Sequence, residues 1–449
     1  MSNEVKRDSN LVLSGNFCRT VVQPKGNLFM QKKILILGAN PETAGLVQKA
    51  NSMGIYTIVT DYDSHAYAKQ YASKACNVDA MDFDGLLALA KEEKVDGIVL
   101  GVAEAIMPTY ARLCRDLNMP CYGNLDLFAL LADKARFKQV CRQYDVPVVD
   151  EFSVDDFSSE EELRKIQLPV VVKPVDSCSS KGISVCKTFQ ELVQGVKKAL
   201  SFSKSKHLLI EKYMTGEEVV IYYAIQDGEA SLVGMCDRYT NKEQKGVAQL
   251  PTSYIFPSKH LEQYSSEVDG KVKGLLRGIG VRNGTMFIQS FIDEKGSVRF
   301  YEPGYRLNGA QEHYLVNEAT GIDARELLIN LALTGKVSDV RIADKADPSF
   351  HGKFGCKLSP LVREGRIGRL VGLAEIAKLP GVLSVNPEYR DGDVVSGYGT
   401  LRQIACRFFL MAESRDALRA LIQEVYDRFD VLDDAGSSML LARFDINLV

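Results

Sequence analysis

Short apolar strands alternate with helical segments near the start of the chain, and this alternation constrains the fold more than any other feature. We predict strands at residues 32–38, 55–61 and 95–101, and helices at residues 41–53 and 108–117. Strands that alternate with helices favour a parallel sheet with helices on both faces. The sequence therefore predicts an α/β chain that opens with a Rossmann-like, doubly wound domain.

Length and charge narrow the classes of protein to which the chain can belong. With 449 residues, at about 100–200 residues per domain, the chain is expected to form about three domains. Its 25% charged residues and net charge of -3 give no electrostatic basis for binding nucleic acid or an anionic membrane surface. Apolar runs stay well short of the ~20 residues that cross a bilayer. We therefore expect neither a nucleic-acid partner nor a membrane segment.

The ten cysteines and five histidines show no metal-binding pattern. No two cysteines form a C-x-x-C pair, and the histidines lack the spacing of metal ligands. Scattered, reduced thiols fit a cytoplasmic protein. Residues 1–30 are mixed and polar and lack the apolar core of a signal peptide, so we expect a poorly ordered extension, with Met30 as an alternative start.

After about residue 125 the pattern changes to hairpins and longer helices. Strands are predicted at residues 168–174, 183–186, 207–214, 218–226, 231–238, 286–293 and 298–303, and helices at residues 126–144, 189–202, 262–276 and 323–333. The strands at residues 218–226 and 231–238 alternate as antiparallel strands do. The strands at residues 286–293 and 298–303 are expected to form a hairpin that turns at residues 294–296. Residues 340–449 mix strands and helices and are expected to form a smaller, final domain.

The first strand leads into a glycine-containing turn at residues 38–45, and Asp61 ends the second strand. Such a turn can hold a dinucleotide pyrophosphate at a helix start, with the carboxylate on a ribose. The spacing is not G-x-G-x-x-G, however, and Pro41 stands where a glycine would be wanted. A tight turn without a cofactor is therefore the preferred interpretation.

Lys173 closes an apolar strand, and the loop that follows it, residues 176–182, is rich in small polar residues. A lysine at that point directs one charge into a cleft, and the backbone N–H groups of such a loop suit phosphate oxygens. Glu211, Lys212 and Tyr213 end a later strand, where backbone groups can bind an adenine edge. Each feature alone is more commonly an ordinary hairpin tip or strand end.

Glu302 ends a hairpin strand, and Arg306 follows it closely. A carboxylate at that point suits Mg²⁺, which prefers oxygen ligands, and an arginine neutralises charge during phosphoryl transfer. Alone, this is also the pattern of a surface ion pair. The order of all these features along one chain favours the functional interpretation.

With this order and spacing, the sequence resembles the ATP-grasp superfamily, in particular the carboxylate–amine ligases related to carbamoyl-phosphate synthetase and L-amino acid ligases. The resemblance covers roughly residues 31–449. It implies a pre-ATP-grasp domain at residues 31–125, an ATP-grasp domain at residues 126–338 and a small C-terminal α+β domain at residues 339–449. The ATP-grasp domain is expected to have two lobes, about residues 126–205 and 206–338.

The resemblance also implies roles for individual residues. ATP would be bound by Lys134, Lys173, Ser179, Ser180, Lys181, Gly182, Glu211, Lys212, Tyr213 and Glu218, Mg²⁺ or Mn²⁺ would be held by Glu302 and Gln289, and Arg306 and Lys173 would be catalytic. Two positions depart from the family pattern. Gln289 stands where the family has a second magnesium glutamate, and Gly304 stands where it has an asparagine. Losing these groups is expected to weaken metal binding.

The implied function is ATP-dependent ligation of a small-molecule carboxylate to an amine through an acyl phosphate. The sequence leaves the oligomeric state open, and a homodimer is one possibility because dimers are common among such enzymes. Two alternatives stay open. One is a bicarbonate-activating carboxylase or carbamoyl-phosphate-type enzyme, against which the missing Met-Lys-Met biotin sequence counts mildly. The other is a nucleotide-binding protein with weakened catalysis, which Gln289 and Gly304 support. An NAD oxidoreductase is the least favoured.

Three further features of the sequence are weaker indications of function. Residues 368–399 resemble the last domain of L-amino acid ligases, which closes the substrate cleft in that family; a packing role stays equally open. The basic segment with Arg238, Lys242 and Lys245 is expected to be a solvated loop rather than a substrate contact. His313 is expected on a helix surface.

Overall fold

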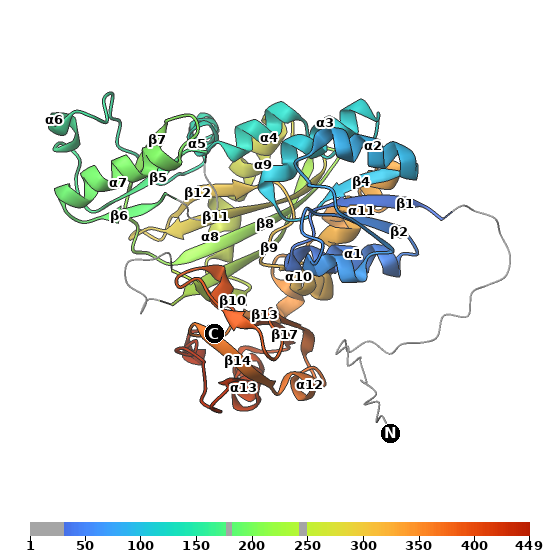
Figure 1. The fold of residues 1–449 in the computed structure, drawn as a ribbon. Helices are drawn as coiled ribbons and strands as arrows, with labels where there is room; N and C mark the ends of the chain where they lie inside the picture. The colour runs from blue at the N-terminus through green and yellow to red at the C-terminus, as the bar shows by residue number, and fades with distance from the viewer. Residues whose placement is uncertain (1–30, 177–181, 242–248) are drawn as a thin grey trace, which may run out of the picture. The chain divides into compact units, whose positions relative to one another are not determined.

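The computed structural model describes residues 31–176, 182–241 and 249–449. They form two compact units: the larger comprises the described parts of Phe29–Tyr239 and Ile255–His351, and the smaller those of Thr240–Tyr254 and Gly352–Val449. Both units mix helices with strands, so the predicted α/β fold class is confirmed (Figure 1). The domain boundaries drawn from the sequence stay a prediction. No helix in the described ranges is long and apolar enough to span a bilayer.

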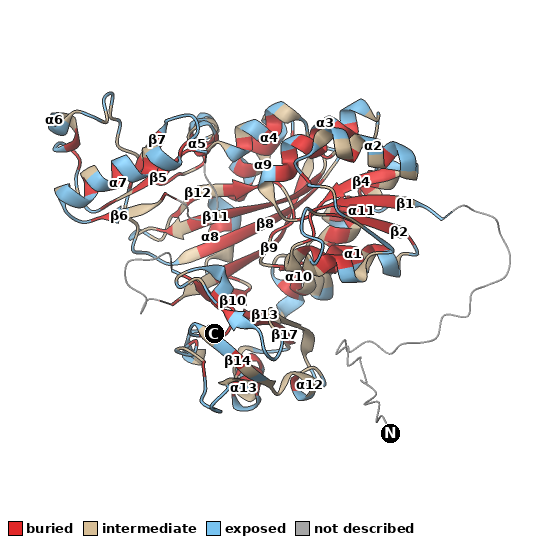
Figure 2. Cartoon of the chain, viewed as in Figure 1, coloured by how far each residue is buried: buried red, intermediate tan, exposed pale blue. Residues whose placement is uncertain are grey.

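A four-stranded parallel sheet begins the larger unit. Its order is β3-β2-β1-β4, with β1 at Lys33–Leu37, β2 at Tyr56–Thr60, β3 at Lys74–Cys76 and β4 at Gly97–Leu100. The apolar runs of β1 and β4 are buried because helices cover both faces, α1 (Ala44–Ser52) on one and α2 (Phe83–Glu93) with α3 (Met107–Asp116) on the other (Figures 1 and 2). The predicted doubly wound sheet is confirmed. The short, exposed edge strand β3 was not predicted, because it lacks an apolar run.

The single helix predicted at residues 126–144 is wrong, because the chain forms two helices there. α4 spans Leu125–Ala132 and α5 spans Lys134–Gln143. Between them Asp133 has an extended backbone, and its carboxylate accepts hydrogen bonds from the N–H groups of Ala135 and Arg136. This capping starts a new helix and makes Lys134 its first residue.

A small antiparallel sheet follows, with strands β5 (Val170–Pro174), β6 (Ser184–Cys186) and β7 (Leu208–Lys212) in the order β6-β5-β7. The short helix α6 (Glu160–Leu163) precedes it. Helix α7 (Phe189–Phe202) begins with a capping box between Thr188 and Glu191, and its apolar face packs on the sheet. The predicted hairpin and the helix after it are confirmed.

The main sheet of the larger unit has the order β12-β11-β8-β9, with β8 at Glu218–Gln226, β9 at Glu229–Thr240, β11 at Gly284–Ile292 and β12 at Val298–Gly304. β8 pairs antiparallel with β9, and β11 with β12, as predicted. The antiparallel pairing of β8 with β11, which joins the two hairpins, was not predicted. The helix predicted at residues 262–276 is divided where Val268 leaves the helical conformation, giving α8 (Leu261–Glu267) and α9 (Asp269–Gly278). Helices α10 (His313–Thr320) and α11 (Ala324–Thr334) follow β12.

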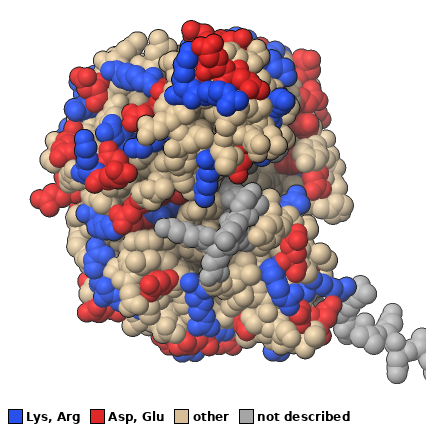
Figure 3. Space-filling model, turned by 90° about the vertical axis from the view of Figure 1, so that its left-hand side faces the viewer, with Lys and Arg blue, Asp and Glu red and all other residues tan. Residues whose placement is uncertain are grey.

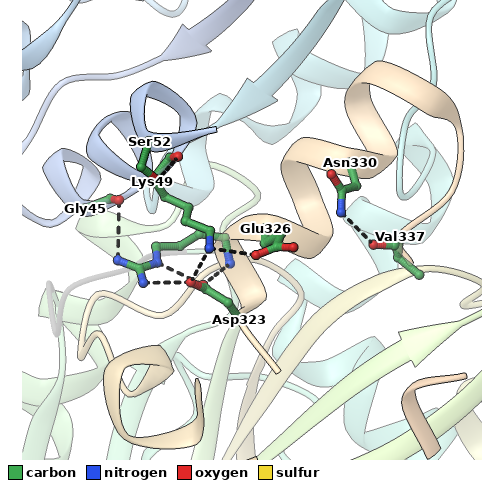
Figure 4. A network of polar contacts seen from close by, with 8 residues as sticks. Gly45, Lys49, Ser52, Asp323, Glu326, Asn330 and Val337 are labelled. Carbon is green, nitrogen blue, oxygen red and sulfur yellow. Dashed lines mark hydrogen bonds and ion pairs between the residues drawn. The ribbon is translucent and has the colours of Figure 1, made fainter. Parts of the chain in front are cut away.

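Charged side chains join α1 to the start of α11 (Figure 4). Lys49 Nζ lies 2.6 Å from a carboxylate oxygen of Glu326 and 3.5 Å from Asp323. Asp323 accepts hydrogen bonds of 2.9 and 2.8 Å from Nε and Nη2 of Arg325, whose Nη1 donates to Gly45 O at 3.5 Å. This network fixes a helix of the first sheet against a helix that follows the main sheet.

The smaller unit contains two groups of antiparallel strands. One has the order β13-β17-β15, in which β13 is Phe354–Leu358, β17 is Cys406–Ala412 and β15 is Val382–Pro387. The other has the order β16-β14-β18, in which β16 is Val394–Val395, β14 is Gly365–Val371 and β18 is Asp430–Asp433. Its helices are α12 (Leu373–Ile376) and α13 (Arg415–Arg428). Strand β10 (Pro251–Phe256) runs through the boundary between the two units.

Candidate functional site

One buried carboxylate neutralises two lysines in the larger unit. Lys173 on β5 lies with its Nζ 2.7 Å from Oε1 of Glu211 on β7, and both side chains are buried. Lys138 on α5 approaches the same oxygen at 2.5 Å, and its Nζ also donates to Val149 O at 3.1 Å. Glu151 lies 3.3 Å from Lys138. The strand pair β5–β7 and helix α5 thus hold Lys173 in a fixed position.

The charges of this cluster depend on one another. Burial lowers the pKa of Lys173, because an ammonium group is disfavoured away from water, and Glu211 offsets this only in part. Burial also acts to raise the pKa of Glu211, but Lys173 and Lys138 outweigh it and hold that pKa below its ordinary value. An ammonium group in this position is stabilised further by any anion that binds beside it.

A second lysine–carboxylate pair lies next to the first. Lys134, the first residue of α5, is buried, and its Nζ lies 3.5 Å from Oε1 of Glu302 on β12. Glu302 is also close enough to Lys173 to favour the charged lysine. The side chain of Glu302 is 34% exposed and that of Lys134 only 7%, so the carboxylate of this pair reaches solvent, whereas that of Glu211 does not.

Glu302 stands opposite Gln289 in the register of β11 and β12. Directly opposite residues of antiparallel strands project from the same face, so a carboxylate and an amide oxygen point the same way. These oxygens suit Mg²⁺ or Mn²⁺, with further oxygens from a phosphate. Within the described residues, no three His, Cys, Asp or Glu side chains gather closely enough to hold a metal by themselves.

The position of Gly304 is closed by an aromatic ring. Gly304 pairs with Phe287 across the strands, and a Cβ atom at Gly304 would lie 2.1 Å from Cζ of that ring. No side chain fits there while Phe287 keeps its position. The ring also lies beneath the guanidinium group of Arg306, 5.1 Å from its centroid.

Arg306 pairs with a residue from the first sheet. Its Nη2 lies 3.4 Å from Oε2 of Glu104, which follows β4, and its Nη1 donates to Leu307 O at 3.0 Å. The side chains of Arg306 and Glu104 are 17% and 23% exposed. A positive and a negative group thus stand side by side, both accessible to a small ligand.

Glu218 lies near this cluster, and Lys212 and Tyr213 follow Glu211 directly in the chain. Glu218 accepts hydrogen bonds from Arg238 and, at 3.4 Å, from the Tyr301 hydroxyl, and Lys173 Nζ lies 5.8 Å from the centroid of the Tyr301 ring. Tyr301 therefore links Glu218 to Lys173. The N–H groups of Lys212 and Tyr213 donate to Asp150 O and Pro169 O, so these two donors already have partners in the chain.

Comparison with known proteins identifies the fold to which this site belongs. Residues 133–340 match the family described as the carbamoyl-phosphate synthase L chain, ATP binding domain. The solved structure of an L-amino acid ligase from Bacillus licheniformis aligns with a TM-score of 0.73 at 19% identity, over 90% of this chain and 99% of that one. The chain therefore has the ATP-grasp fold.

Other relatives also match large parts of this chain. The 2-oxoglutarate carboxylase small subunit of Hydrogenobacter thermophilus is 25% identical over 80% of this chain and 78% of its own length. The solved biotin carboxylase domain of that enzyme has a TM-score of 0.71 at 19% identity, over 91% of each chain. A carbamoyl phosphate synthase large chain of Clostridium botulinum is 23% identical over 69% of this chain, which spans only 30% of that protein.

Part of the predicted ATP-grasp site lies outside the described residues, namely Ser179, Ser180 and Lys181, and so do Lys242 and Lys245 of the predicted basic segment. Gly182 is described; its φ of +80° and its closeness to Phe202 and Pro174 leave no room for a larger residue. Asp237, beside that basic segment, is buried and accepts a 2.5 Å hydrogen bond from Ser258 Oγ.

The glycine-containing turn after β1 makes a hydrogen bond within the chain at the place where a dinucleotide phosphate would bind. Ala39 N–H donates to Asp61 Oδ2 at 3.0 Å, and Gly38 has a φ of +84°. A carboxylate that accepts from the turn repels the pyrophosphate that a dinucleotide would put there. The geometry therefore supports the tight turn over the dinucleotide site.

The expectation that His313 lies on a helix surface is wrong. His313 is the first residue of α10 and is buried beside Arg306 and Thr285 in a cavity of about 20 Å³, about the size that holds one water molecule. Burial, with the positive charge of Arg325, lowers the pKa of His313 well below its ordinary value. The ring is therefore neutral at pH 7.

Sequence reasoning missed Lys138, Glu104 and Phe287. Lys138 carried one usable signal, because it lies four residues after Lys134 and so on the same helix face. Glu104 and Phe287 carried no such signal, because each contacts a residue that is distant in the sequence. Glu104 contacts Arg306, and Phe287 contacts Gly304.

Proposed function

We propose that this protein is an ATP-grasp enzyme, an ATP-dependent ligase that joins a carboxylate to an amine through an acyl phosphate. The observation that carries the proposal is the convergence of Lys134 and Lys173 beside Glu302. Two buried ammonium groups offer fixed positive charge to a polyphosphate, and Glu302 offers oxygen to Mg²⁺. The solved 2-oxoglutarate carboxylase domain was crystallised with MgADP, which supports ATP and magnesium as cofactors here.

The proposed chemistry uses position and charge rather than a nucleophilic side chain. Lys134 and Lys173 bind and orient the phosphates, and Arg306 holds the carboxylate near the γ-phosphate and neutralises charge as the phosphoryl group is transferred. Magnesium, when bound, neutralises negative charge on the phosphates. The amine then attacks the acyl phosphate and releases inorganic phosphate.

The pair of Glu104 and Arg306 favours a substrate that carries both charges. Bicarbonate is an anion, and beside Arg306 it would also meet the carboxylate of Glu104, 3.4 Å away. A molecule with a carboxylate and an ammonium group, such as an α-amino acid, matches both partners. We therefore propose amino acids as the substrate class. We also propose a homodimer, which the solved dimer of the 2-oxoglutarate carboxylase domain supports.

The test is release of inorganic phosphate from ATP in the presence of pools of amino acids, other carboxylates or bicarbonate. Amino acids are expected to stimulate the wild-type protein, and Lys173→Ala is expected to lose about 100-fold or more of that rate. Lys187→Ala, which removes an exposed lysine, is the matched control. Equal rates of phosphate release for Lys173→Ala and the wild type would contradict the proposal.

The bicarbonate-activating alternative is supported by the Hydrogenobacter relative, a carboxylase whose solved domain contains bicarbonate. Bicarbonate-dependent turnover without amino-acid stimulation would favour it. The alternative of a nucleotide-binding protein with weakened catalysis is supported by Gln289 and by the ring over Gly304. ATP binding without turnover on any pool would favour that interpretation.

A further inference from the structure

Four residues of β11 and β12 make up one patch, which we call the metal edge: Phe287, Gln289, Glu302 and Gly304. Gln289 faces Glu302 and Phe287 faces Gly304 in one uninterrupted stretch of register, and the bulge comes only after Gln289. Residues two apart on a strand, and residues directly opposite each other, share a face of the sheet. The metal edge therefore has four positions from which a side chain can reach one bound cation.

Only one of these four positions carries a charge. Glu302 supplies a carboxylate, Gln289 a neutral amide, Phe287 a ring and Gly304 nothing. The ring of Phe287 excludes a ligand at Gly304, because any Cβ there would lie 2.1 to 2.8 Å from three ring carbons. Arg306 lies over the same ring and brings positive charge to this side of the patch.

Paired divalent cations about 3.5–4 Å apart need carboxylates or phosphates around them to offset four positive charges. Glu302 already faces the ammonium group of Lys134 at 3.5 Å. An amide oxygen is a much weaker partner than a carboxylate for Mg²⁺, which binds through one or two carboxylates and the substrate phosphates. The negative charge at the metal edge is enough for one cation.

We propose that the metal edge holds one divalent cation with the bound nucleotide rather than two, because Gln289 supplies a neutral amide instead of a carboxylate and Phe287 closes position 304 to a ligand. The inference rests on the proposed function, since it requires a nucleotide at this site. It makes Phe287 a positioning residue: the ring keeps position 304 empty and supports the guanidinium of Arg306.

The experiment counts Mn²⁺ bound to the full chain with a saturating, non-hydrolysable ATP analogue, using electron paramagnetic resonance to measure free Mn²⁺. Calorimetry measures binding of the analogue separately. The wild type is expected to bind one ion per nucleotide. Gln289→Glu restores a carboxylate opposite Glu302 and is expected to bind two. Gln190→Glu, the same change at an exposed residue of α7, is expected to stay at one.

A double variant, Phe287→Ala with Gly304→Asn, tests the ring. Removing the ring makes room for an amide at position 304, and the count is expected to rise above one. Two ions in the wild type would overturn the inference, as would a count of one that neither Gln289→Glu nor the double variant raises. Failure of the wild type to bind the analogue at all would instead refute the proposed function, and this inference with it.

Discussion

Glu211 and Glu302 are both carboxylates beside a lysine in one site, but their surroundings differ. Glu211 is buried, bonds Lys173 and Lys138 at 2.7 and 2.5 Å, and lies on a strand that is paired along its length with β5. Glu302 is one-third exposed and lies 3.5 Å from Lys134. Glu211 therefore satisfies charges that the fold has buried, and Glu302 keeps oxygen available to a ligand.

The two carboxylates therefore contribute differently to the stability of the fold. A buried carboxylate between two ammonium groups cannot be lost cheaply, because the ammonium groups stay buried without a partner. An exposed carboxylate is hydrated when it is unpaired, so its loss weakens ligand binding and changes the free energy of unfolding little. The lysine cluster and the metal edge should thus respond oppositely to similar substitutions. Basic and acidic side chains are interspersed on the face drawn in Figure 3, so no strong field of one sign on that face should mask these local effects.

Glu211→Gln is expected to have the largest effect on stability. It leaves Lys138 and Lys173 buried without a carboxylate between them, and breaking a buried pair in this way costs about 3–5 kcal/mol. Urea denaturation at pH 7 measures the free energy of unfolding. A loss below about 1 kcal/mol would contradict the buried cluster and remove the contrast with Glu302.

The Glu211 carboxylate also sets a pH dependence. Because its pKa is lower in the folded chain than in the unfolded chain, its stabilising contribution is complete above the ordinary glutamate pKa of about 4.3 and is lost as the pH falls through the lower, folded value. The difference between wild type and Glu211→Gln should therefore shrink below about pH 4. A constant difference down to pH 3 would contradict this.

Asp323→Asn tests whether a buried ion pair outside the site, that of Asp323 with Arg325, also stabilises the fold. The expected loss of stability is smaller than for Glu211→Gln. Burial acts to raise the pKa of Asp323, but hydrogen bonds and charge from Arg325 hold it at about 2. Against about 3.9 in the unfolded chain, that shift is worth about 2–3 kcal/mol at pH 7. The stability difference measured by urea denaturation should disappear as the pH falls from about 4 toward 2. Lys94→Ala, an exposed lysine after α2, is a control expected to change little.

Much of the fold could be predicted from local sequence. The apolar runs of β1 and β4 are long enough to require burial on both sides, and the alternation in β8 and β9 sets their antiparallel pairing. The breaks at Asp133 and Val268 were missed, because the apolar stripe continues through both and hides the change of direction. Asp133 did carry a signal, since an aspartate is a strong start for a helix.

Only those residues of the candidate site that follow the expected order along the chain could be predicted from the sequence. Lys134, Lys173, Glu211 and Glu302 appear in the expected order, and the fold brings them together. Their partners could not be predicted, because Lys138 under Glu211 and Phe287 over Gly304 depend on packing between distant segments. His313 was misplaced for the same reason: the residues that bury it come from β8, β11 and α11.

Gly304→Ala tests whether the Phe287 ring leaves room for a side chain at position 304 of the metal edge. The new Cβ would meet the Phe287 ring at 2.1 Å, and forcing a methyl group into packed space costs about 1–3 kcal/mol. Thermal or urea unfolding measures the loss. Combining it with Phe287→Leu should recover part of that loss, because the smaller side chain gives way. If Gly304→Ala is as stable as the wild type, the ring is not fixed over the glycine.

Glu302→Gln is expected to have the smallest effect on folding. Its side chain is one-third exposed and its distance from Lys134 is 3.5 Å, so the pair contributes little and the free energy of unfolding should change by less than about 0.5 kcal/mol. Phosphate release and Mn²⁺ binding should nevertheless fall sharply, because the one charged oxygen ligand of the metal edge is gone. Measured together with Glu211→Gln, the two variants separate a carboxylate that holds the fold from one that serves a ligand. A loss of several kcal/mol in Glu302→Gln, with metal binding intact, would show that both carboxylates are structural and that the metal is held elsewhere.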